Sequence, residues 1–158
     1  MQSLSFKICL VVASLFGTVS AGSNLQPCPQ NGMDSWHLCE GTFIENGDTF
    51  RGEFKNNLKN GFGIYTWKNG DSFSGNYEND KKNGAGIYFY ETGDIFEGTF
   101  LDGLAQGRGT YTHSDGSKFV GNYRKGERTG LGKLVFHDGS IFEGEFLNGK
   151  RTGFGTAT

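Results

Sequence analysis

Few residues in this chain have the types and spacing that catalysis requires. The 158 residues include three histidines and three cysteines, and none of them stands in the order or spacing of a nucleophile–base pair or triad. No Gly-x-x-x-x-Gly-Lys-Ser/Thr phosphate loop occurs, and the frequent Gly-x-Gly pairs are not followed by helical patterns. His113 and His137 are interpreted as variants of turn and ring positions. We therefore expect no catalytic residue, no cofactor and no enzymatic activity.

An acidic column is the pattern closest to a metal site. Asp48, Asp71 and Asp94 follow turn glycines at a constant interval, and a ladder of carboxylates is one way to bind calcium. The equivalent position holds Ser117 and Ser140 further along the chain, and Asp after Asn-Gly or Thr-Gly is common turn chemistry. We therefore predict no metal site.

The first 21 residues have the pattern of a secretory signal peptide. Lys7 is the only charged residue among the first 33. The apolar run 8–16 that follows has the length of a signal h-region and is too short for a membrane-spanning helix, which needs about 20 residues. Residues 19–21, Val-Ser-Ala, fit a cleavage site. We expect export to the periplasm or outside the cell, with a mature chain that begins at Gly22. An uncleaved anchor or a buried strand is the alternative.

Two cysteines, Cys28 and Cys39, remain after the predicted cleavage. An even number of cysteines in an exported chain indicates a disulfide, which we predict between these two. Their spacing does not match a zinc knuckle, and only His37 lies near them in the sequence. A free or metal-bound pair is the alternative.

The composition indicates an all-β protein with many turns. Glycine accounts for 27 residues and aromatic residues for 15% of the chain, whereas proline occurs twice. Ring-rich strands separated by glycine turns are expected of such a composition, and disordered low-complexity chains are poor in rings. The net charge of −2 does not favour a basic surface for nucleic acid.

A strict period of 23 residues runs through the chain. Gly-x-Gly pairs recur at this step, as do a phenylalanine, a glycine two residues after it and a second ring two residues further on. So many columns in register indicate a tandem repeat in which each unit packs on its neighbours. The pairs are Gly61/Gly63, Gly84/Gly86, Gly107/Gly109, Gly130/Gly132 and Gly153/Gly155, and the phenylalanines are Phe50, Phe73, Phe96, Phe119 and Phe142.

This unit, with an Asn/Thr/Asp-Gly turn after its second strand, resembles the MORN repeat. The resemblance covers residues 38–158 and implies an elongated single-layer antiparallel meander of repeated β-hairpins, a MORN-type β solenoid. The Trp-x-x-Cys-x-Gly start is similar to that of exported bacterial MORN proteins. Asn57 and Asp80 replace a family glycine, which suggests local bulges at those positions. The expected organisation is a signal peptide at 1–21, a cysteine-containing cap at 22–37, and units at 50–72, 73–95, 96–118, 119–141 and, in part, 142–158.

Turn length decides whether the rings share one face of the sheet. A two-residue loop within the turn 68–70 would place Tyr65 and Phe73 on opposite faces. A three-residue loop with its glycine in the left-handed conformation would pair them. We favour the second register, which also places Gly61 opposite Tyr77, because it gathers the rings on one face and leaves charged residues on the other.

The ring face is the feature with the clearest potential for binding. Rings on one face are most simply a hydrophobic core. A single-layer sheet cannot cover all of them, however, and exposed apolar patches mark partner surfaces. The candidate binding face consists of Tyr65, Trp67, Phe73, Tyr77, Tyr88, Tyr90, Phe96, Phe100, Tyr111, Phe119 and Tyr123.

A non-enzymatic interaction or structural scaffold that binds another protein is the function we favour. One alternative is peripheral binding to anionic lipid through Lys125, Arg128, Lys150 and Arg151. Loss of Lys7 with the signal peptide, which carries no acid, lowers the net charge from −2 to −3 and argues against it. A second alternative is recognition of cell-wall glycan by the rings. A homodimer through the C-terminal sheet edge is also expected to be possible.

Overall fold

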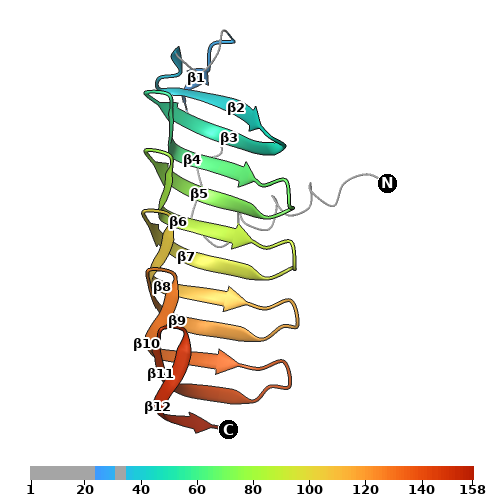
Figure 1. Ribbon diagram of the computed structural model, residues 1–158, viewed down its shortest axis with the longest axis vertical. Helices are drawn as coiled ribbons and strands as arrows, with labels where there is room; N and C mark the ends of the chain where they lie inside the picture. The colour runs from blue at the N-terminus through green and yellow to red at the C-terminus, as the bar shows by residue number, and fades with distance from the viewer. Residues whose placement is uncertain (1–23, 31–34) are drawn as a thin grey trace, which may run out of the picture.

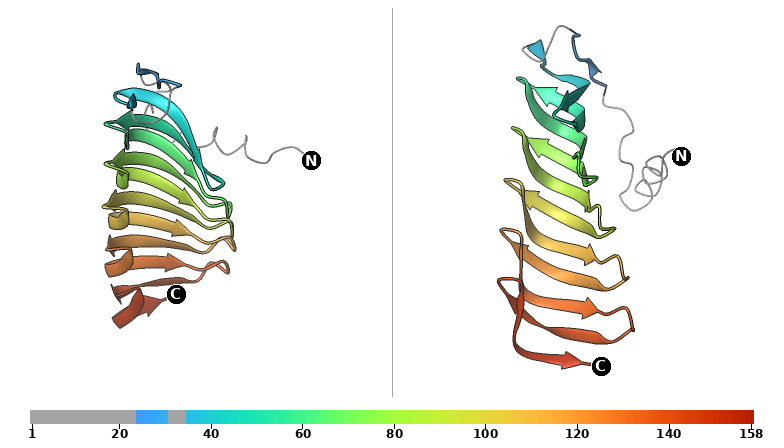
Figure 2. Two further views of the ribbon diagram at one scale, coloured as in Figure 1. Left: turned by 45° about the horizontal axis from the view of Figure 1, so that its top comes forward. Right: turned by 45° about the vertical axis from the view of Figure 1, so that its right-hand side comes forward.

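The computed structural model describes residues 24–30 and 35–158 as one antiparallel sheet with a short parallel strand at its start. The predicted signal peptide lies outside the described residues. Figures 1 and 2 show an open, twisted single layer in which spatial order follows chain order. The predicted fold class is confirmed. The strands are β1 (Gln26–Pro27), β2 (Cys39–Glu45), β3 (Asp48–Lys55), β4 (Leu58–Thr66), β5 (Ser72–Glu78), β6 (Lys81–Phe89), β7 (Ile95–Leu101), β8 (Leu104–Thr112), β9 (Lys118–Arg124), β10 (Glu127–Val135), β11 (Ile141–Leu147) and β12 (Lys150–Ala157).

One row of turns sets the predicted register. Between β4 and β5 the Trp67 N–H donates to the Asp71 carbonyl at 2.9 Å, and the Gly70 N–H donates to the Trp67 carbonyl at 3.0 Å. Gly70 has φ 99°, the left-handed conformation that glycine adopts without strain. As a result Tyr65 pairs with Phe73, so the three-residue register is confirmed.

The opposite row consists of two-residue turns in which both residues have positive φ. Asn56 and Asn57 have φ values of 52° and 67°, which is the type I′ geometry that matches strand twist. Asn and Asp tolerate this conformation better than other non-glycine residues. Asn57 and Asp80 can therefore occupy the second turn position, which is glycine in later units. The expectation of bulges at these two residues is wrong. A register shift occurs instead opposite Glu53, beside Gly61, whose φ is 101°.

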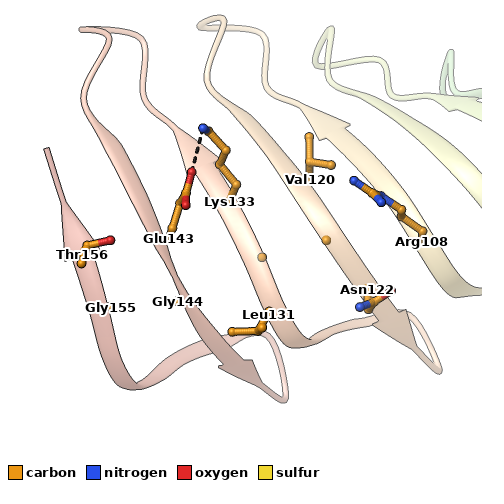
Figure 3. A pocket seen from close by; sticks show the side chains of 11 residues that line it. Arg108, Val120, Asn122, Leu131, Lys133, Glu143, Gly144, Gly155 and Thr156 are labelled. Atoms are coloured by element: carbon orange, nitrogen blue, oxygen red, sulfur yellow. Dashed lines mark ion pairs between the residues drawn. The ribbon is translucent and has the colours of Figure 1, made fainter.

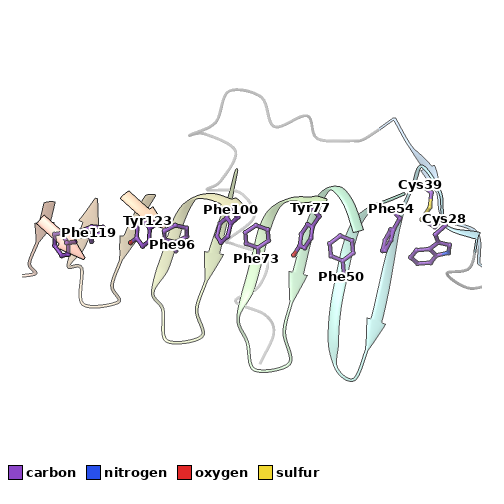
Figure 4. Packing of buried hydrophobic residues seen from close by; sticks show 12 residues of the cluster. Cys28, Cys39, Phe50, Phe54, Phe73, Tyr77, Phe96, Phe100, Phe119 and Tyr123 are labelled. Carbon is purple, nitrogen blue, oxygen red and sulfur yellow. A yellow bond between two sulfur atoms is a disulfide. The ribbon is translucent and has the colours of Figure 1, made fainter. Parts of the chain in front are cut away.

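The inner row of rings forms the core along the whole array. The first ring of each unit packs edge-to-face against the second ring of the next unit, as between Phe50 and Tyr77 at 5.1 Å and between Phe73 and Phe100 at 4.9 Å. Figure 4 shows these rings in file along the sheet. Glycines provide the room, since a Cβ on Gly86 would collide with the Phe73 ring. The buried rings are Phe50, Phe54, Phe73, Tyr77, Phe96, Phe100, Phe119, Tyr123 and Phe146.

A disulfide-linked cap covers the N-terminal end of this row. Cys28 and Cys39 are bonded and buried, which confirms the predicted disulfide. Trp36 packs edge-to-face on Phe54 at 4.6 Å, and its Nε1 donates to the Pro29 carbonyl at 2.9 Å. The Trp36 indole thus packs on the second ring of the first unit, where elsewhere the first ring of the preceding unit packs.

Candidate functional site

The rings predicted to form a binding face divide into two groups by exposure. Six lie buried in the inner row, where a partner cannot contact them in this conformation, whereas five are half-buried and pack against that row. His113 is half-buried too and occupies the repeat position of Trp67 and Tyr90. We call the second group with His113 the aromatic strip. The buried group is Phe73, Tyr77, Phe96, Phe100, Phe119 and Tyr123, and the aromatic strip is Tyr65, Trp67, Tyr88, Tyr90, Tyr111 and His113.

The aromatic strip is a continuous file of contacting rings across three units. Trp67 and Tyr88 are stacked, with centroids 5.2 Å apart and an interplanar angle of 29°. Tyr88 and Tyr90 approach to 4.5 Å, and Tyr111 and His113 to 4.7 Å. Each pair lies within the range in which aromatic rings attract one another. The strip therefore offers an ordered apolar surface with neighbouring rings in contact.

Aspartates fix the hydroxyls of three of the four tyrosines in the strip. The Tyr88 hydroxyl donates to Oδ2 of Asp71 at 2.9 Å, while Oδ1 of the same carboxylate accepts the Glu91 N–H at 2.8 Å. The Glu91 N–H makes the largest contribution to the lowered pKa of Asp71. Asp48 holds Tyr65 in the same way, and Asp94 holds Tyr111. The acidic column thus links each turn to the next unit.

These hydrogen bonds also raise the pKa of the tyrosines. Burial is the largest cause for Tyr65, the hydrogen bond to Asp48 adds to it, and together they raise the pKa of Tyr65 to about 12. Its hydroxyl therefore stays protonated and keeps donating through the physiological range. The tyrosines of the strip therefore carry no charge at neutral pH.

Cationic side chains lie over the strip from the strands that follow the two-residue turns. Lys82 Nζ lies 4.7 Å from the centroid of the Tyr88 ring and 5.4 Å from that of Trp67, within cation–π range. Burial lowers the pKa of Lys82, and no ion pair of this ammonium occurs within the described residues. Lys59 lies over Tyr65 at 5.3 Å, and Arg128 over Tyr111 at 5.6 Å. The strip consequently combines apolar rings with positive charge.

The strip ends where two positions change together. Leu134 replaces the tyrosine, and Ser117 replaces the aspartate that would bind it; the Ser117 hydroxyl instead accepts the His137 N–H at 3.1 Å. Before this end, His113 Nδ1 lies 3.4 Å from Asp94 and its Nε2 lies 3.5 Å from Arg128. Neither the tyrosine–aspartate pairs nor the cations Lys59, Lys82 and Arg128 over the strip were predicted from the sequence. Both keep the 23-residue period, and the paired change to leucine and serine is visible in the sequence.

The four residues predicted to contact anionic lipid lie near two adjacent two-residue turns. Lys125 and Lys150 are exposed. Arg128 is turned onto the ring face, with its guanidinium carbon 4.5 Å from the Phe119 centroid, and Arg151 lies 5.2 Å from that of Phe142. The structure therefore brings the four together but points two of them toward rings. Lipid binding by this set stays a prediction.

A shallow hollow of about 790 Å³ lies on the face opposite the rings. Figure 3 shows Arg108, Leu131 and the Lys133–Glu143 ion pair around it, with the Lys133 Nζ and the Glu143 Oε1 2.7 Å apart. Its side chains are mostly exposed, and its charges are already paired in part. This hollow lacks the convergent buried polar groups of a small-molecule site.

Among residues 24–30 and 35–158, no group of three His, Cys, Asp or Glu side chains is placed to hold a metal ion. Over the same residues there is no helix long and apolar enough to span a membrane.

Comparison with known families gives a match over most of the sheet. The family model for the MORN repeat matches residues 50–72, 73–95, 96–118, 119–141 and 142–158. No curated protein matches the chain.

Proposed function

Because the chain belongs to the MORN repeat family, we propose that it is an exported, non-enzymatic scaffold that binds a segment of another protein along its aromatic strip. MORN repeats are in general protein- or membrane-interaction modules, and the repeat type is non-catalytic. The proposal adds a compartment, a binding surface and a class of partner to that general role.

The aromatic strip with its cations is the observation that carries the proposal. Its rings are half-buried and ordered by contact with one another, and three of its tyrosines are held by hydrogen bonds to Asp48, Asp71 and Asp94. A preorganised surface loses little conformational entropy on binding, and aromatic residues dominate the energetic centres of protein interfaces. Lys82 adds a positive charge that forms no ion pair with any other described residue. An apolar segment that carries an acidic side chain would satisfy both features.

The disulfide supports the proposed compartment. Cys28 and Cys39 are bonded at the buried base of the cap, and structural disulfides persist in oxidising compartments. Together with the signal-peptide pattern of residues 1–21, this favours the periplasm or the extracellular space. Mass determination of the protein recovered from cells tests cleavage directly: a chain that begins at Gly22 supports export, and an intact Met1 argues against it.

Site-specific photo-crosslinking in cells tests the binding surface. A photoreactive amino acid at Trp67 or Tyr90 should capture one protein, whereas the same group at Ile87, on the opposite face, should not. Ile87 is the matched control for both positions, so the experiment needs no competing acidic peptide. Equal capture from both faces, or none from the strip, would reject the strip as the binding surface.

Binding to anionic lipid is the second candidate, favoured by the adjacent Lys125 and Lys150. Co-sedimentation of the purified protein with anionic and neutral vesicles at low and high salt separates the two candidates. If the protein is a scaffold, the vesicles should cause no additional pelleting at either salt concentration. Pelleting with anionic vesicles alone, lost at high salt and in Lys125→Glu/Lys150→Glu, would favour the lipid surface instead. Glycan binding through the rings would be largely insensitive to salt.

A further inference from the structure

The two rows of turns carry opposite charge, although the net charge of the chain is small. We define the tight-turn row as residues 54–59, 77–82, 100–105, 123–128 and 146–151. The wide-turn row consists of the turns on the opposite side, residues 44–49, 66–72, 89–95, 112–118 and 135–141; its first turn has only two residues, since Glu45 pairs with Asp48. The tight-turn row contains nine basic and four acidic residues, whereas the wide-turn row contains seven acidic and two basic residues. Figure 1 shows that the two rows lie on opposite long sides of the sheet.

The charge is concentrated further at two diagonally opposite corners. The last two turns of the tight-turn row form the basic corner, which has five basic residues and one acidic residue, and the first three turns of the wide-turn row form the acidic corner, which has five acidic residues and one basic residue. The charged residues of the basic corner are Arg124, Lys125, Glu127, Arg128, Lys150 and Arg151. Those of the acidic corner are Glu45, Asp48, Lys68, Asp71, Glu91 and Asp94.

Most of these charges are available to a partner. Within the described residues none of the five bases of the basic corner forms an ion pair with a carboxylate, and Arg124, Lys125 and Lys150 are exposed. In the acidic corner Glu45 and Glu91 are exposed. The aspartates at its base are held by hydrogen bonds that favour the carboxylate form, as for Asp71. In the part of the tight-turn row that is nearer the N-terminus, Asp80 forms an ion pair with Lys59, and Asp102 forms one with Lys81.

Both rows advance with the same period, because every unit contributes one turn to each. The step is about 10 Å, two strand spacings. A second copy laid alongside and displaced along the sheet axis would therefore set its acidic turns beside the basic turns of the first copy, one for one. From this charge complementarity and shared period we propose that the chain associates laterally with copies of itself, the basic corner of one copy against the acidic corner of the next.

This contact is heterologous, since different surfaces of the two copies meet. After one contact forms, one copy still has a free acidic corner and the other a free basic corner. Further copies can therefore add at both ends, and the association extends into an open, staggered row. A polyanion would use only the basic corner and would leave the acidic corner without a role, whereas a second copy uses both. Single exposed ion pairs contribute little, so the association depends on several pairs at once and on low salt.

Sedimentation velocity of the purified protein, in the form that the cell produces, tests the proposal. At about 0.01 M salt the screening length is about 30 Å, and at about 1 M it is about 3 Å. We expect association that rises with protein concentration at low salt and is weakened at least tenfold at high salt. A protein that stays monomeric at low salt at every concentration overturns the proposal.

Charge-reversal variants identify the two corners. Arg124→Glu/Lys150→Glu should be monomeric, and so should Glu45→Lys/Glu91→Lys. An equimolar mixture of the two variants should associate again, because each keeps the surface that the other needs. Association that persists in the separate variants, or a mixture that stays monomeric, overturns the proposal.

A control pair, Arg108→Glu/Glu145→Lys, reverses two exposed charges outside both rows and should associate like the unchanged protein. Loss of association in this control would also overturn the assignment to the corners. If the protein does not self-associate but binds polyphosphate at the basic corner, self-association is overturned and a polyanion is the partner instead.

Discussion

Alanine at Gly86 should destabilise the sheet through one specific ring. The backbone of Gly86 is outside the left-handed region, so alanine fits its conformation. An added Cβ would nevertheless collide with the outer end of the Phe73 ring, and it would approach the Ser74 carbonyl oxygen to 3.2 Å. Phe73 has no exposed surface, so its ring has nowhere to move without disturbing its neighbours.

The expected magnitude follows from two opposing contributions. Replacing glycine by alanine reduces the entropy of the unfolded chain, which stabilises by about 0.4–1 kcal/mol. Overpacking a filled core costs about 1–3 kcal/mol. Because the added Cβ would collide with a ring that has no exposed surface, the upper overpacking cost applies, and we expect Gly86→Ala to lower the free energy of unfolding by roughly 2–2.6 kcal/mol, which is that cost less the entropic gain.

A double-mutant cycle distinguishes the ring collision from a general effect of the substitution. Phe73→Leu alone should destabilise, because it removes buried carbon atoms. In that background Gly86→Ala should cost little, which gives a coupling of at least about 1 kcal/mol. Gly126→Ala is the matched control: it has φ 85° and no atom within 4 Å of an added Cβ, so left-handed strain costs about 1–2 kcal/mol in both backgrounds.

Urea denaturation followed by circular dichroism measures all four stabilities of the cycle. If Gly86→Ala is equally destabilising with phenylalanine or leucine at position 73, the idea that this glycine is required by the ring is refuted.

Three further predictions concern hydrogen bonds, pH and the cap. Tyr88→Phe should lower stability by about 1 kcal/mol, since it removes the hydroxyl that donates to Oδ2 of Asp71, whereas Tyr123→Phe should be neutral or stabilising, because the buried Tyr123 hydroxyl forms no hydrogen bond within the part of the chain that the structure describes; urea denaturation of both variants gives the sign. The folded-state pKa of Asp71 lies below its ordinary value of 3.8, chiefly through a backbone N–H donor, so its contribution is present above about pH 4 and lost as pH falls through the lowered pKa. An acid titration of Asp71→Asn should accordingly be less steep than that of the unchanged protein, and an identical titration would contradict the assignment. Reduction of the Cys28–Cys39 disulfide should cost at most about 3 kcal/mol and act locally, so the fluorescence of the cap tryptophan should shift while the far-ultraviolet spectrum of the array is retained.

Sequence reasoning predicts the sheet well because the repeat makes each residue column visible several times. A three-residue turn with a terminal glycine pairs Tyr65 with Phe73, and the structure has that pairing. The disulfide between Cys28 and Cys39 was also predictable, since these are the two cysteines that would remain after the predicted cleavage. A bulge was expected at Asn57 because the loss of a family glycine from the inter-strand loop suggested an irregular backbone, although asparagine tolerates the left-handed conformation too. Its φ of 67° places it within a two-residue turn.

The candidate site was predicted less completely, because the repeat pattern in the sequence does not show which ring side chains are exposed to solvent. Phe73 and Tyr65 have the same ring chemistry in the sequence, yet the first is buried and the second half-buried. The difference arises from packing between units, where Phe73 meets Phe100 across the repeat boundary. Lys82 was not singled out either, since its place over four rings depends on the path of the chain after the preceding turn.

The strictly sequential order of the strands has a consequence for how the chain acquires its structure. Phe50 contacts Tyr77, 27 residues later, and each two-residue turn is bonded to the unit before it, as where the Asp80 N–H donates to the Lys59 carbonyl. Every hairpin therefore needs only its predecessor as a template. A chain emerging from a ribosome or an export channel can fold vectorially, cap first, without waiting for its C-terminal half. Lengthening such an array by duplication should leave its folding rate nearly unchanged, because contact order does not grow with the number of units.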